Sequence, residues 1–390
     1  MAGSTPRARG TCRLQLAGRT CWFRWSPRSV VAAVDGDLVC WDRAGRPWAG
    51  VWEGRSWRRS LAGEYLEILD SRGLRVLKPC AAEEARRWDQ RARRLARNLQ
   101  AALVALGGEP AAMAPRLEAM TGDRSGDAEA FSRIYRPISI LPPDRYLALV
   151  LQFSRGCPWN RCTFCHFYRD RSFRPLDPAA ARAHLEAVVE GFGAGITLRR
   201  SIFLADANAL AAPPGRIEQW LGLIREAFPE ASPGPRADGI YSFTDLLTGG
   251  DQDPAFWQRL ARGGLTGVYL GLETGHGELL ERLGKPGPPG RAVEMVHRIK
   301  QAGLKVGVIL LAGFAAPLAA AHRRASLDLV RRLPLGPDDL VFVSPLVGAP
   351  AGVAVLDPED RRRQARDLIG ALREVCGRRA ALYDIRRFVY

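Results

Sequence analysis

The sequence predicts an α/β protein whose larger part is an open barrel of six βα units, preceded by a small β-rich domain and a helical linker. Three observations predict it: six apolar runs from residue 146 onward, helical patterns between the runs, and short β-prone segments near the N-terminus. Continuous apolar runs are typical of buried parallel strands, which need crossover helices between them. We therefore expect a β-rich domain over 1–80, a helix and linker over 81–136, the barrel over 137–350, and a C-terminal helix and strand over 351–390.

The β-rich domain is predicted from strand and turn signals that alternate between Cys12 and about Val76. The run SVVAAV, for example, is followed by Asp35-Gly36 and then by LVCW. An Asp-Gly pair between β-prone runs indicates a tight hairpin. Aromatic residues also favour strands, so a small antiparallel unit is expected. Four of the 10 tryptophans lie close together within residues 41–57: Trp41, Trp48, Trp52 and Trp57.

The linker begins with a helical pattern. Residues 82–106 are rich in Ala, Arg, Leu and Glu and are followed by two glycines, which is typical of one long helix and its end. Residues 109–133 contain scattered Gly, Pro and Asp. That composition predicts a mobile connection to the barrel.

The barrel is predicted from residue 146 onward. Right-handed crossovers in strict alternation favour a partial (β/α)6 TIM-like barrel. A helix over 358–376 and a terminal strand over 383–390 complete the chain. The expected strands cover 146–153, 201–205, 239–243, 267–272, 306–311 and 340–346. The expected helices between them cover 178–190, 215–227, 254–262, 291–302 and 319–332.

Composition bounds the class of protein. The chain has 390 residues, of which 47% are hydrophobic and 25% charged, as in ordinary soluble globular proteins. The N-terminus has no apolar stretch of signal-peptide length. The most apolar run, Val306 to Ala321, contains two glycines and a proline and predicts a buried strand and a turn. We expect a cytoplasmic protein that does not bind membranes.

The net charge of +16 keeps a nucleic-acid partner among the alternatives. Clustered positive charge favours phosphate binding, so a tRNA or another nucleotide-containing substrate is consistent with it. Only four residues are lysine, however, and the remaining positive charge is arginine in an Ala-, Gly- and Pro-rich chain. A GC-rich coding sequence gives this pattern with any partner, so charge alone does not identify the substrate.

Three of the eight cysteines are clustered in the segment SRGCPWNRCTFCH, directly after the first barrel strand. Loops at the carboxyl ends of parallel strands are where ligands bind in this architecture. Three thiolates can hold three irons of a cubane iron-sulfur cluster, whereas a ferredoxin cluster has a fourth cysteine ligand. No fourth cysteine lies nearby, so one iron stays open for another ligand. The predicted metal ligands are Cys157, Cys162 and Cys165.

Two alternatives remain for the cysteines. A structural zinc site needs four Cys or His ligands, and His166 is the only local candidate beyond the three thiols. The other five cysteines are widely spaced and are expected to be small buried hydrophobes, although four of them leave a second metal site open. These five are Cys12, Cys21, Cys40, Cys80 and Cys376.

The segment GCPWNRCTFC resembles the cysteine motif of the radical S-adenosylmethionine superfamily. It is most similar to the branch with the tRNA methylthiotransferases, the elongator catalytic subunit and oxygen-independent coproporphyrinogen dehydrogenase. The resemblance implies a [4Fe-4S] cluster whose open iron is chelated by S-adenosyl-L-methionine. It also implies that Phe164 lies beside the adenine. One departure is visible, because four residues separate the first two cysteines where the family has three.

Later strand ends carry groups that the resemblance assigns to S-adenosylmethionine. Asp206 or Asn208, after the second strand, would meet the methionyl amine, and Glu273 would contact the ribose and carboxylate region. Lys285 would approach the carboxylate of the cofactor. The expected cofactor-binding residues are Phe164, Asp206, Ser242, Glu273, Lys285, Gly307 and Val308.

The resemblance implies an enzyme that reductively cleaves S-adenosylmethionine to give a 5'-deoxyadenosyl radical, which acts on a substrate that the sequence does not identify. A low-potential electron donor such as flavodoxin or ferredoxin is then required. Tyr241 and Asn208 are expected to face the barrel interior and are the candidate catalytic residues. The alternative is a non-catalytic iron-sulfur or zinc protein that binds nucleic acid.

Overall fold

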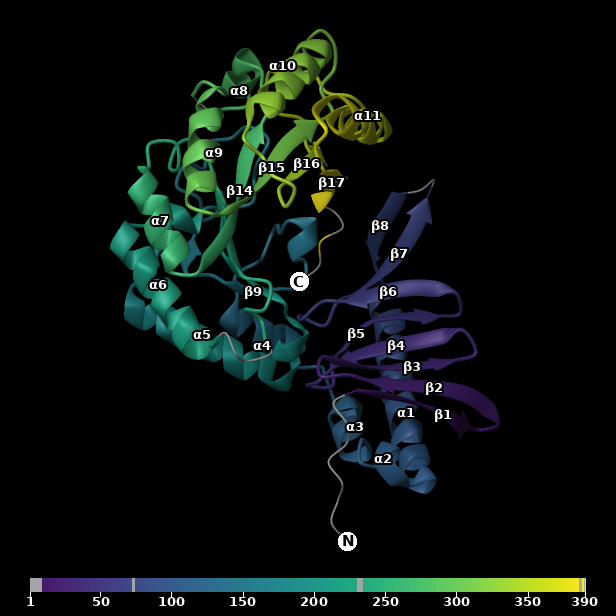
Figure 1. Ribbon diagram of the computed structural model, residues 1–390. Coiled ribbons are helices and arrows are strands. Elements are labelled where there is room, and N and C mark those ends of the chain that lie inside the picture. Colours follow the sequence, from purple (N-terminus) through teal and green to yellow (C-terminus); the bar gives the residue numbers. More distant parts are fainter. Residues whose placement is uncertain (1–8, 72–73, 230–233, 286, 386–387, 389) are drawn as a thin grey trace.

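The structure is a computed structural model that describes residues 9–71, 74–229, 234–285, 287–385, 388 and 390. It consists of an antiparallel sheet with its helices and a larger α/β part with a parallel sheet, which lie side by side (Figure 1). The α/β class and the N-terminal β-rich unit expected from the sequence are therefore confirmed. The bounds of the four ranges given above remain predictions.

The N-terminal sheet is an antiparallel meander of eight strands in chain order. Tight turns with two left-handed residues join several strands, and at Asp35-Gly36 the φ values are 48° and 86°. Such φ values match the primed turns that favour Asp-Gly. The strands are β1 Gly10–Leu16, β2 Arg19–Trp25, β3 Ser29–Val34, β4 Asp37–Asp42, β5 Pro47–Trp52, β6 Arg55–Arg59, β7 Tyr65–Ser71 and β8 Leu74–Pro79.

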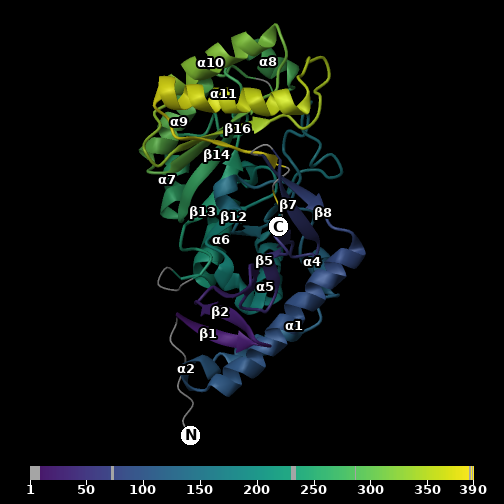
Figure 2. The same ribbon diagram turned by 90° about the vertical axis from the view of Figure 1, so that its right-hand side faces the viewer.

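Helix α1, Ala82–Leu106, runs along one face of this sheet (Figure 2). Trp41 and Trp57 on the sheet and Trp88 on the helix are buried in one core. The segment expected to be a mobile connection instead contains three helices, and Leu117 and Met120 of the second are buried in the same core. The Gly and Pro residues lie at helix ends, which composition alone does not reveal. These helices are α2 Gly108–Ala111, α3 Ala114–Thr121 and α4 Asp127–Ile134.

The second part has a parallel sheet of seven strands in the order β17-β16-β15-β14-β13-β12-β9. The six expected strands and the helices between them are confirmed to within a few residues. The strands are β9 Ala148–Leu151, β12 Ser201–Leu204, β13 Ile240–Thr244, β14 Leu265–Glu273, β15 Lys305–Ala312, β16 Leu340–Pro345 and β17 Ala380–Leu382. The helices are α5 Pro178–Phe192, α6 Pro214–Ala227, α7 Pro254–Arg262, α8 Gly277–Arg282, α9 Arg291–Gln301, α10 Leu318–Arg332 and α11 Pro358–Cys376.

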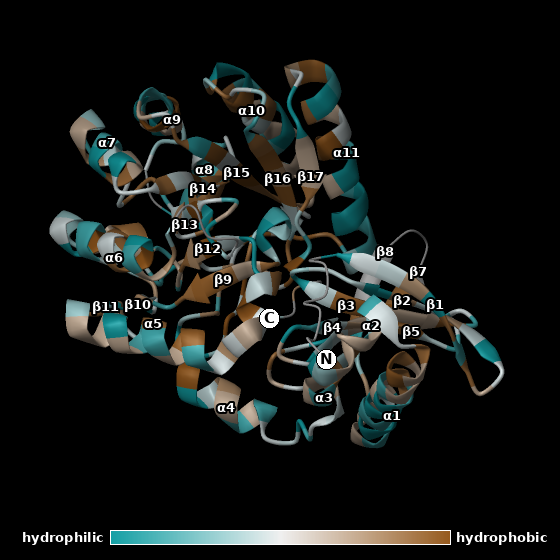
Figure 3. Cartoon of the chain, turned by 60° about the horizontal axis from the view of Figure 1, so that its bottom comes forward, coloured by the Kyte–Doolittle hydropathy of each residue, from teal (hydrophilic) through white to brown (hydrophobic). Residues whose placement is uncertain are grey.

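The helices form an arc around the outside of the strands, with their apolar sides toward the sheet (Figure 3). Within the described residues, β9 and β17 form the two edges and do not pair with each other, so the sheet is open. The last strand was predicted over 383–390, but β17 ends at Leu382 and pairs with β16 in parallel. Residues 386, 387 and 389 of the predicted strand lie outside the described residues.

The two parts are joined by specific contacts. The Arg46 guanidinium donates to the backbone oxygen of Gly191 at 2.9 Å and to that of Phe192 at 2.5 Å. The Leu61 amide donates to the Tyr390 oxygen at 3.0 Å. No helix among the described residues is both long and apolar enough to cross a bilayer.

Candidate functional site

A cavity of about 350 Å³ lies at the carboxyl ends of the parallel strands. Its wall is largely apolar, and a few polar groups from the strand ends interrupt it. Cavities of this size with convergent polar groups are typical of sites for small molecules. Apolar lining residues include Ile140, Phe164, Phe167, Phe243, Ile309, Leu311, Leu346 and Ile385. Polar lining residues include Cys157, Cys165, His166, Tyr168, Asn208, Thr244, Asp245, Glu273, Lys285, Ser344 and Tyr383.

The cysteine loop follows β9 directly. Asp206, at the end of the neighbouring strand β12, accepts a hydrogen bond from the Gly156 amide at 2.9 Å and one from the Gln152 side chain at 2.7 Å. Arg171, beyond the last cysteine, lies 3.4 Å from the same carboxylate. Asp206 is 3% exposed. The Asp206 carboxylate therefore holds both ends of the cysteine loop, at Gly156 and at Arg171.

Arg169 holds the middle of the loop together. Its guanidinium donates to the backbone oxygens of Cys162 at 2.7 Å and Cys165 at 3.3 Å, and also to that of Asn160. Asn160 has a φ of 51°, and its side-chain NH2 donates to the backbone oxygen of Tyr168 at 2.7 Å. Asparagine tolerates this left-handed conformation better than most residues. Arg169 thus orients the loop.

The other side of the loop is fixed to the turn after α8. The Trp159 indole donates to the Gly284 oxygen at 2.6 Å, and the Thr163 amide donates to the Leu283 oxygen at 2.9 Å. Gly284 has a φ of 68°, and a Cβ there would lie 2.8 Å from the Arg161 oxygen. Only glycine meets both requirements. The cysteine loop and the turn that carries Lys285 are therefore packed as one unit.

The three thiols lie on one short loop, and Cys157 and Cys165 are near enough to Cys162 to act on its charge. All three are free, and Cys157 and Cys165 line the cavity. Zinc–sulfur bonds of about 2.3 Å in a tetrahedral site put two thiolates about 3.8 Å apart, whereas thiolates on separate irons of a cubane lie farther apart. In the described part of the chain, no three His, Cys, Asp or Glu side chains are close enough to hold one metal ion.

Burial dominates the electrostatics of these thiols. It raises the pKa of Cys162 to about 12, and it also raises the pKa of Cys165. Both groups are protonated at neutral pH when only protein surrounds them, so metal binding must displace their protons.

A buried ion pair lies at the same cavity, close to Cys162. The Lys285 ammonium lies 2.7 Å from the Glu273 carboxylate and donates to the Gly271 oxygen at 2.5 Å. Burial lowers the pKa of Lys285, but Glu273 and then Cys162 raise it, and the net shift is upward. Glu273 has a φ of 65° at a register shift in β14. A non-glycine residue in this conformation is strained, and such strain is often found at functional sites.

Three buried polar atoms of residues in the cavity wall have no hydrogen-bond partner among the described residues: Asn208 Oδ1, Thr244 Oγ1 and the Tyr383 hydroxyl oxygen. The Asn208 side-chain NH2 is used, because it donates to Asp245 at 2.8 Å and to Thr248 at 2.6 Å. Its orientation is therefore fixed, with the oxygen left free. Buried polar atoms normally have partners, so these three are available to a ligand.

Of the predicted residues, the structure brings Phe164, Asn208, Glu273 and Lys285 to the same cavity as the cysteines. Asp206 and Ser242 do not line it. Asp206 binds the cysteine loop as described above, and the Ser242 hydroxyl donates to the Leu204 oxygen at 3.0 Å with no exposed surface. Ser242, expected to bind a cofactor, lies away from the cavity because the strand continues two residues beyond it, to Thr244.

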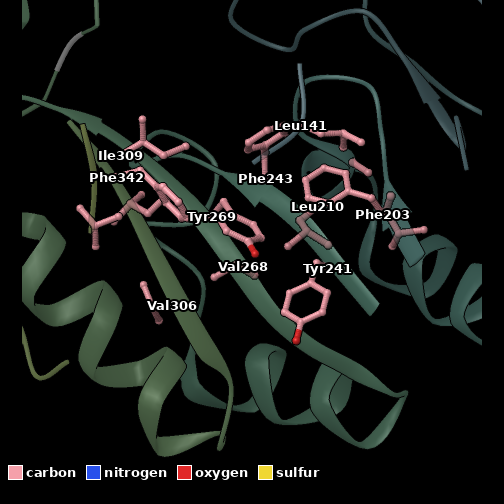
Figure 4. Close-up of a cluster of buried hydrophobic side chains, with 14 of the residues drawn as sticks. Leu141, Phe203, Leu210, Tyr241, Phe243, Val268, Tyr269, Val306, Ile309 and Phe342 are labelled. Atoms are coloured by element: carbon pink, nitrogen blue, oxygen red, sulfur yellow. The ribbon is translucent and has the colours of Figure 1, made fainter. Parts of the chain in front are cut away.

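Tyr241 also lies away from the cavity. It shares the inner face of β13 with Phe243, but it is one layer lower, and its hydroxyl points away from Phe243 (Figure 4). Its ring stacks on the Arg145 guanidinium at 3.8 Å and lines a separate hollow at the opposite end of the sheet. This position does not support the catalytic role expected for it.

Gly307 and Val308 do not reach the cavity wall either. On β15 that wall is formed by Ile309 and Leu311. A Cβ on Gly307 would lie 2.4 Å from the Tyr269 ring, so the glycine makes room for a core aromatic residue. The two residues expected to bind the cofactor on this strand therefore lie before the part of β15 that reaches the cavity.

The Gly307→Ala variant is expected to lose about 1–3 kcal/mol of unfolding free energy, because the methyl group overpacks the core against Tyr269. Gly222→Ala is the matched control. It lies inside α6 with nothing within 4 Å of the added Cβ, and it is expected to gain up to about 1 kcal/mol. Urea unfolding followed by circular dichroism measures both values, and equal effects would show that Tyr269 does not crowd this position.

Sequence reasoning missed several cavity residues, among them Thr244, Asp245 and Ser344. All three lie at or just after the ends of β13 and β16. Their polar side chains follow apolar runs, and that signal was available in the sequence. The last residue of each strand could not be placed closely enough to use it.

Residues 151–315 match the family model described as the radical SAM superfamily. A curated relative, 4'-phospho-dehydrooxetanocin synthase of Priestia megaterium, is 27% identical over 173 residues, which cover 42% of this chain and 23% of the relative. The chain therefore spans less than a quarter of the length of the curated relative it matches.

Two solved structures extend the comparison. One is coproporphyrinogen III oxidase (HemN) from Escherichia coli, at 14% identity and a TM-score of 0.40, which covers 58% of this chain and 53% of that one. The other is HydG, a maturase of the [FeFe]-hydrogenase, at 15% identity and a TM-score of 0.42, which covers 77% and 66%.

Proposed function

The chain belongs to the radical SAM superfamily, and on that premise we propose that it is an enzyme with a [4Fe-4S] cluster and S-adenosylmethionine in the cavity described above. When bound and reduced, the cluster would supply the electron that cleaves S-adenosylmethionine to methionine and a 5'-deoxyadenosyl radical. The protein's part is to bind, orient and shield the reactants.

One observation carries the proposal: a three-cysteine loop lies at the same cavity as a buried ion pair and three unpartnered polar atoms. Cys157, Cys162 and Cys165 would hold three irons and leave the fourth open. A nucleoside with amino, carboxylate and hydroxyl groups suits the polar atoms on the other walls. We take the parallel sheet with its arc of helices as a partial (β/α)6 TIM-like barrel, which puts these groups at its carboxyl end.

Individual roles follow from position. Lys285 and Glu273 would bind the carboxylate and hydroxyl groups of S-adenosylmethionine, and Phe164 would pack against the adenine. Asn208 Oδ1 and Thr244 Oγ1 would accept or donate the remaining hydrogen bonds. The apolar wall around Ile309 and Leu311 excludes water, which protects a reactive intermediate from side reactions.

The substrate and partners complete the proposal. Reduction requires a low-potential donor such as flavodoxin or ferredoxin, and we propose a cytoplasmic location. A tRNA or another nucleotide-containing substrate remains one candidate class, on charge alone. No finding favours the alternative of a non-catalytic nucleic-acid-binding protein.

The test is anaerobic reconstitution of the chain with iron and sulfide, followed by S-adenosylmethionine and a strong reductant. We expect about four irons per chain, a change in the electron paramagnetic resonance spectrum of the cluster on adding S-adenosylmethionine, and formation of 5'-deoxyadenosine. An intact cluster that gives neither the spectral change nor the product would overturn the proposal.

Thr244→Val is expected to weaken S-adenosylmethionine binding about two- to tenfold, because it removes a hydroxyl that is free to bind the ligand. The same change should leave the unfolding free energy within about 0.5 kcal/mol, since that hydroxyl has no partner in the described chain. Calorimetric titration of the reconstituted chain and urea unfolding measure the two quantities.

Thr266→Val is the control for this variant. The Thr266 hydroxyl accepts the Ile240 amide at 3.0 Å at the other end of the sheet, so its loss should cost stability and leave cofactor affinity unchanged. A Thr244→Val chain that binds S-adenosylmethionine like the unchanged chain would remove Thr244 from the site.

A further inference from the structure

A second cavity, of about 390 Å³, lies between the two parts of the chain. The N-terminal domain contributes residues from the β4–β5 turn and the end of β6, and the α/β part contributes residues that precede β9, β12 and β13. Those positions are at the amino ends of the parallel strands. The cavity is therefore separate from the cysteine site, which lies at the carboxyl ends.

Arginines dominate the charge of this cavity. Five arginines and three aspartates line it. The aspartates already have partners: Asp42 binds Arg46 at 3.0 Å, Asp238 binds Arg200 at 2.8 Å, and Asp144 accepts the Tyr269 hydroxyl at 2.7 Å. Positive charge is therefore left in excess.

Arg199 carries that excess. It is 7% exposed, and its guanidinium lies between the rings of Phe192 and Tyr390, 4.9 Å and 4.8 Å from their centroids. No hydrogen bond or ion pair joins its side chain to any residue that the structure describes, and its Nε is buried without an acceptor. A buried charge without a partner is costly. The rings favour the cation but provide no acceptor for its N–H groups.

Two more donors of the same cavity, both from the N-terminal domain, are unpartnered within the described chain: Arg59 Nε and Trp48 Nε1. Arg59 is 8% exposed and is paired through another nitrogen with Asp127 at 2.8 Å. All three free groups are N–H donors, and two belong to cations. Such a set selects a ligand that offers acceptor oxygens and negative charge.

We propose that this interdomain cavity is a second binding site, for a small molecule with a phosphate or carboxylate group that pairs with Arg199. The volume suits a small organic anion. Because Arg59 and Trp48 come from one domain and Arg199 from the other, the bound anion links the two domains. The site is independent of the proposed radical chemistry, since no residue of the cysteine cavity lines it.

The test is calorimetric titration of the reconstituted full chain with inorganic phosphate, pyrophosphate and citrate, in anion-poor buffer at constant ionic strength. We expect saturable binding of at least one probe and a higher melting temperature with it. Arg199→Met should weaken that binding tenfold or more. Binding of the phosphates alone assigns a phosphoryl ligand, and binding of citrate alone assigns a carboxylate.

Arg182→Met is the matched control, because Arg182 is an exposed arginine on α5 that pairs with Glu226 at 3.0 Å, away from the cavity. It removes the same charge and should leave binding unchanged. If Arg199→Met does not fold, Arg58→Glu puts a negative charge into the same cavity from the N-terminal domain and should weaken binding equally. The proposal is overturned if no probe saturates, or if the cavity variants bind as tightly as Arg182→Met.

Discussion

Replacing Cys162 by alanine is expected to abolish cluster binding and, with it, the formation of 5'-deoxyadenosine. In the proposed function the chain would supply three thiolates for the cluster, and the loss of one would leave two irons without a protein ligand. After anaerobic reconstitution, iron should fall from about four atoms per chain to near zero, and the visible absorbance of the cluster should be lost. Iron analysis and chromatography of the reaction products measure the effect.

Cys40→Ala is the control for this variant. Cys40 lies on β4 of the N-terminal sheet and does not line the cysteine cavity. It should keep full iron content and activity. Loss of iron in Cys40→Ala would revive the second metal site that the sequence left open, and full iron in Cys162→Ala would remove Cys162 from the cluster.

Replacing Lys285 by methionine is expected to cost about 3–5 kcal/mol of unfolding free energy, because Glu273 then stays buried without its partner. The pair has a separation of 2.7 Å, and both side chains are nearly buried, at 11% and 8% exposure. Urea unfolding of the metal-free chain measures the loss without any contribution from ligands. Cofactor cleavage should also fall, since the variant lacks the proposed carboxylate ligand.

The double variant Lys285→Met/Glu273→Leu separates pairing from packing. Removing both charges should recover much of the lost stability, because no unpaired charge remains. Lys305→Met, an exposed lysine at the start of β15, removes the same charge and should change stability by less than about 0.5 kcal/mol. A Lys285→Met chain as stable as Lys305→Met would mean that the ion pair does not stabilise the fold.

The strands of the parallel sheet and the helices between them could be predicted because their patterns are long and local. Each buried parallel strand is a run of apolar residues, as in VGVILL within Lys305–Ala312, and α11 begins and ends at the predicted residues. The cysteine loop was equally visible, since its three thiols follow one strand end. These features need no knowledge of the distant chain.

The side chains at the strand ends could not all be predicted. Ser242 and Thr244 share one face of β13, and only the exact strand end decides which of them meets the cavity. Gly307 depends on Tyr269 of the neighbouring strand, a contact that no local pattern contains. Asp206 was predicted to bind a ligand, yet its hydrogen bonds to Gly156 and Gln152 form only once the loop has folded back over β12.

The hydrogen bonds of Arg169 and Trp159 have a consequence for substitutions outside the cavity wall. Arg169 joins the backbone of the loop at Cys162 and Cys165, and Trp159 joins the loop to Gly284, next to Lys285. A change at either side chain is therefore expected to displace the thiols and the Lys285 turn together, although neither side chain touches the cavity.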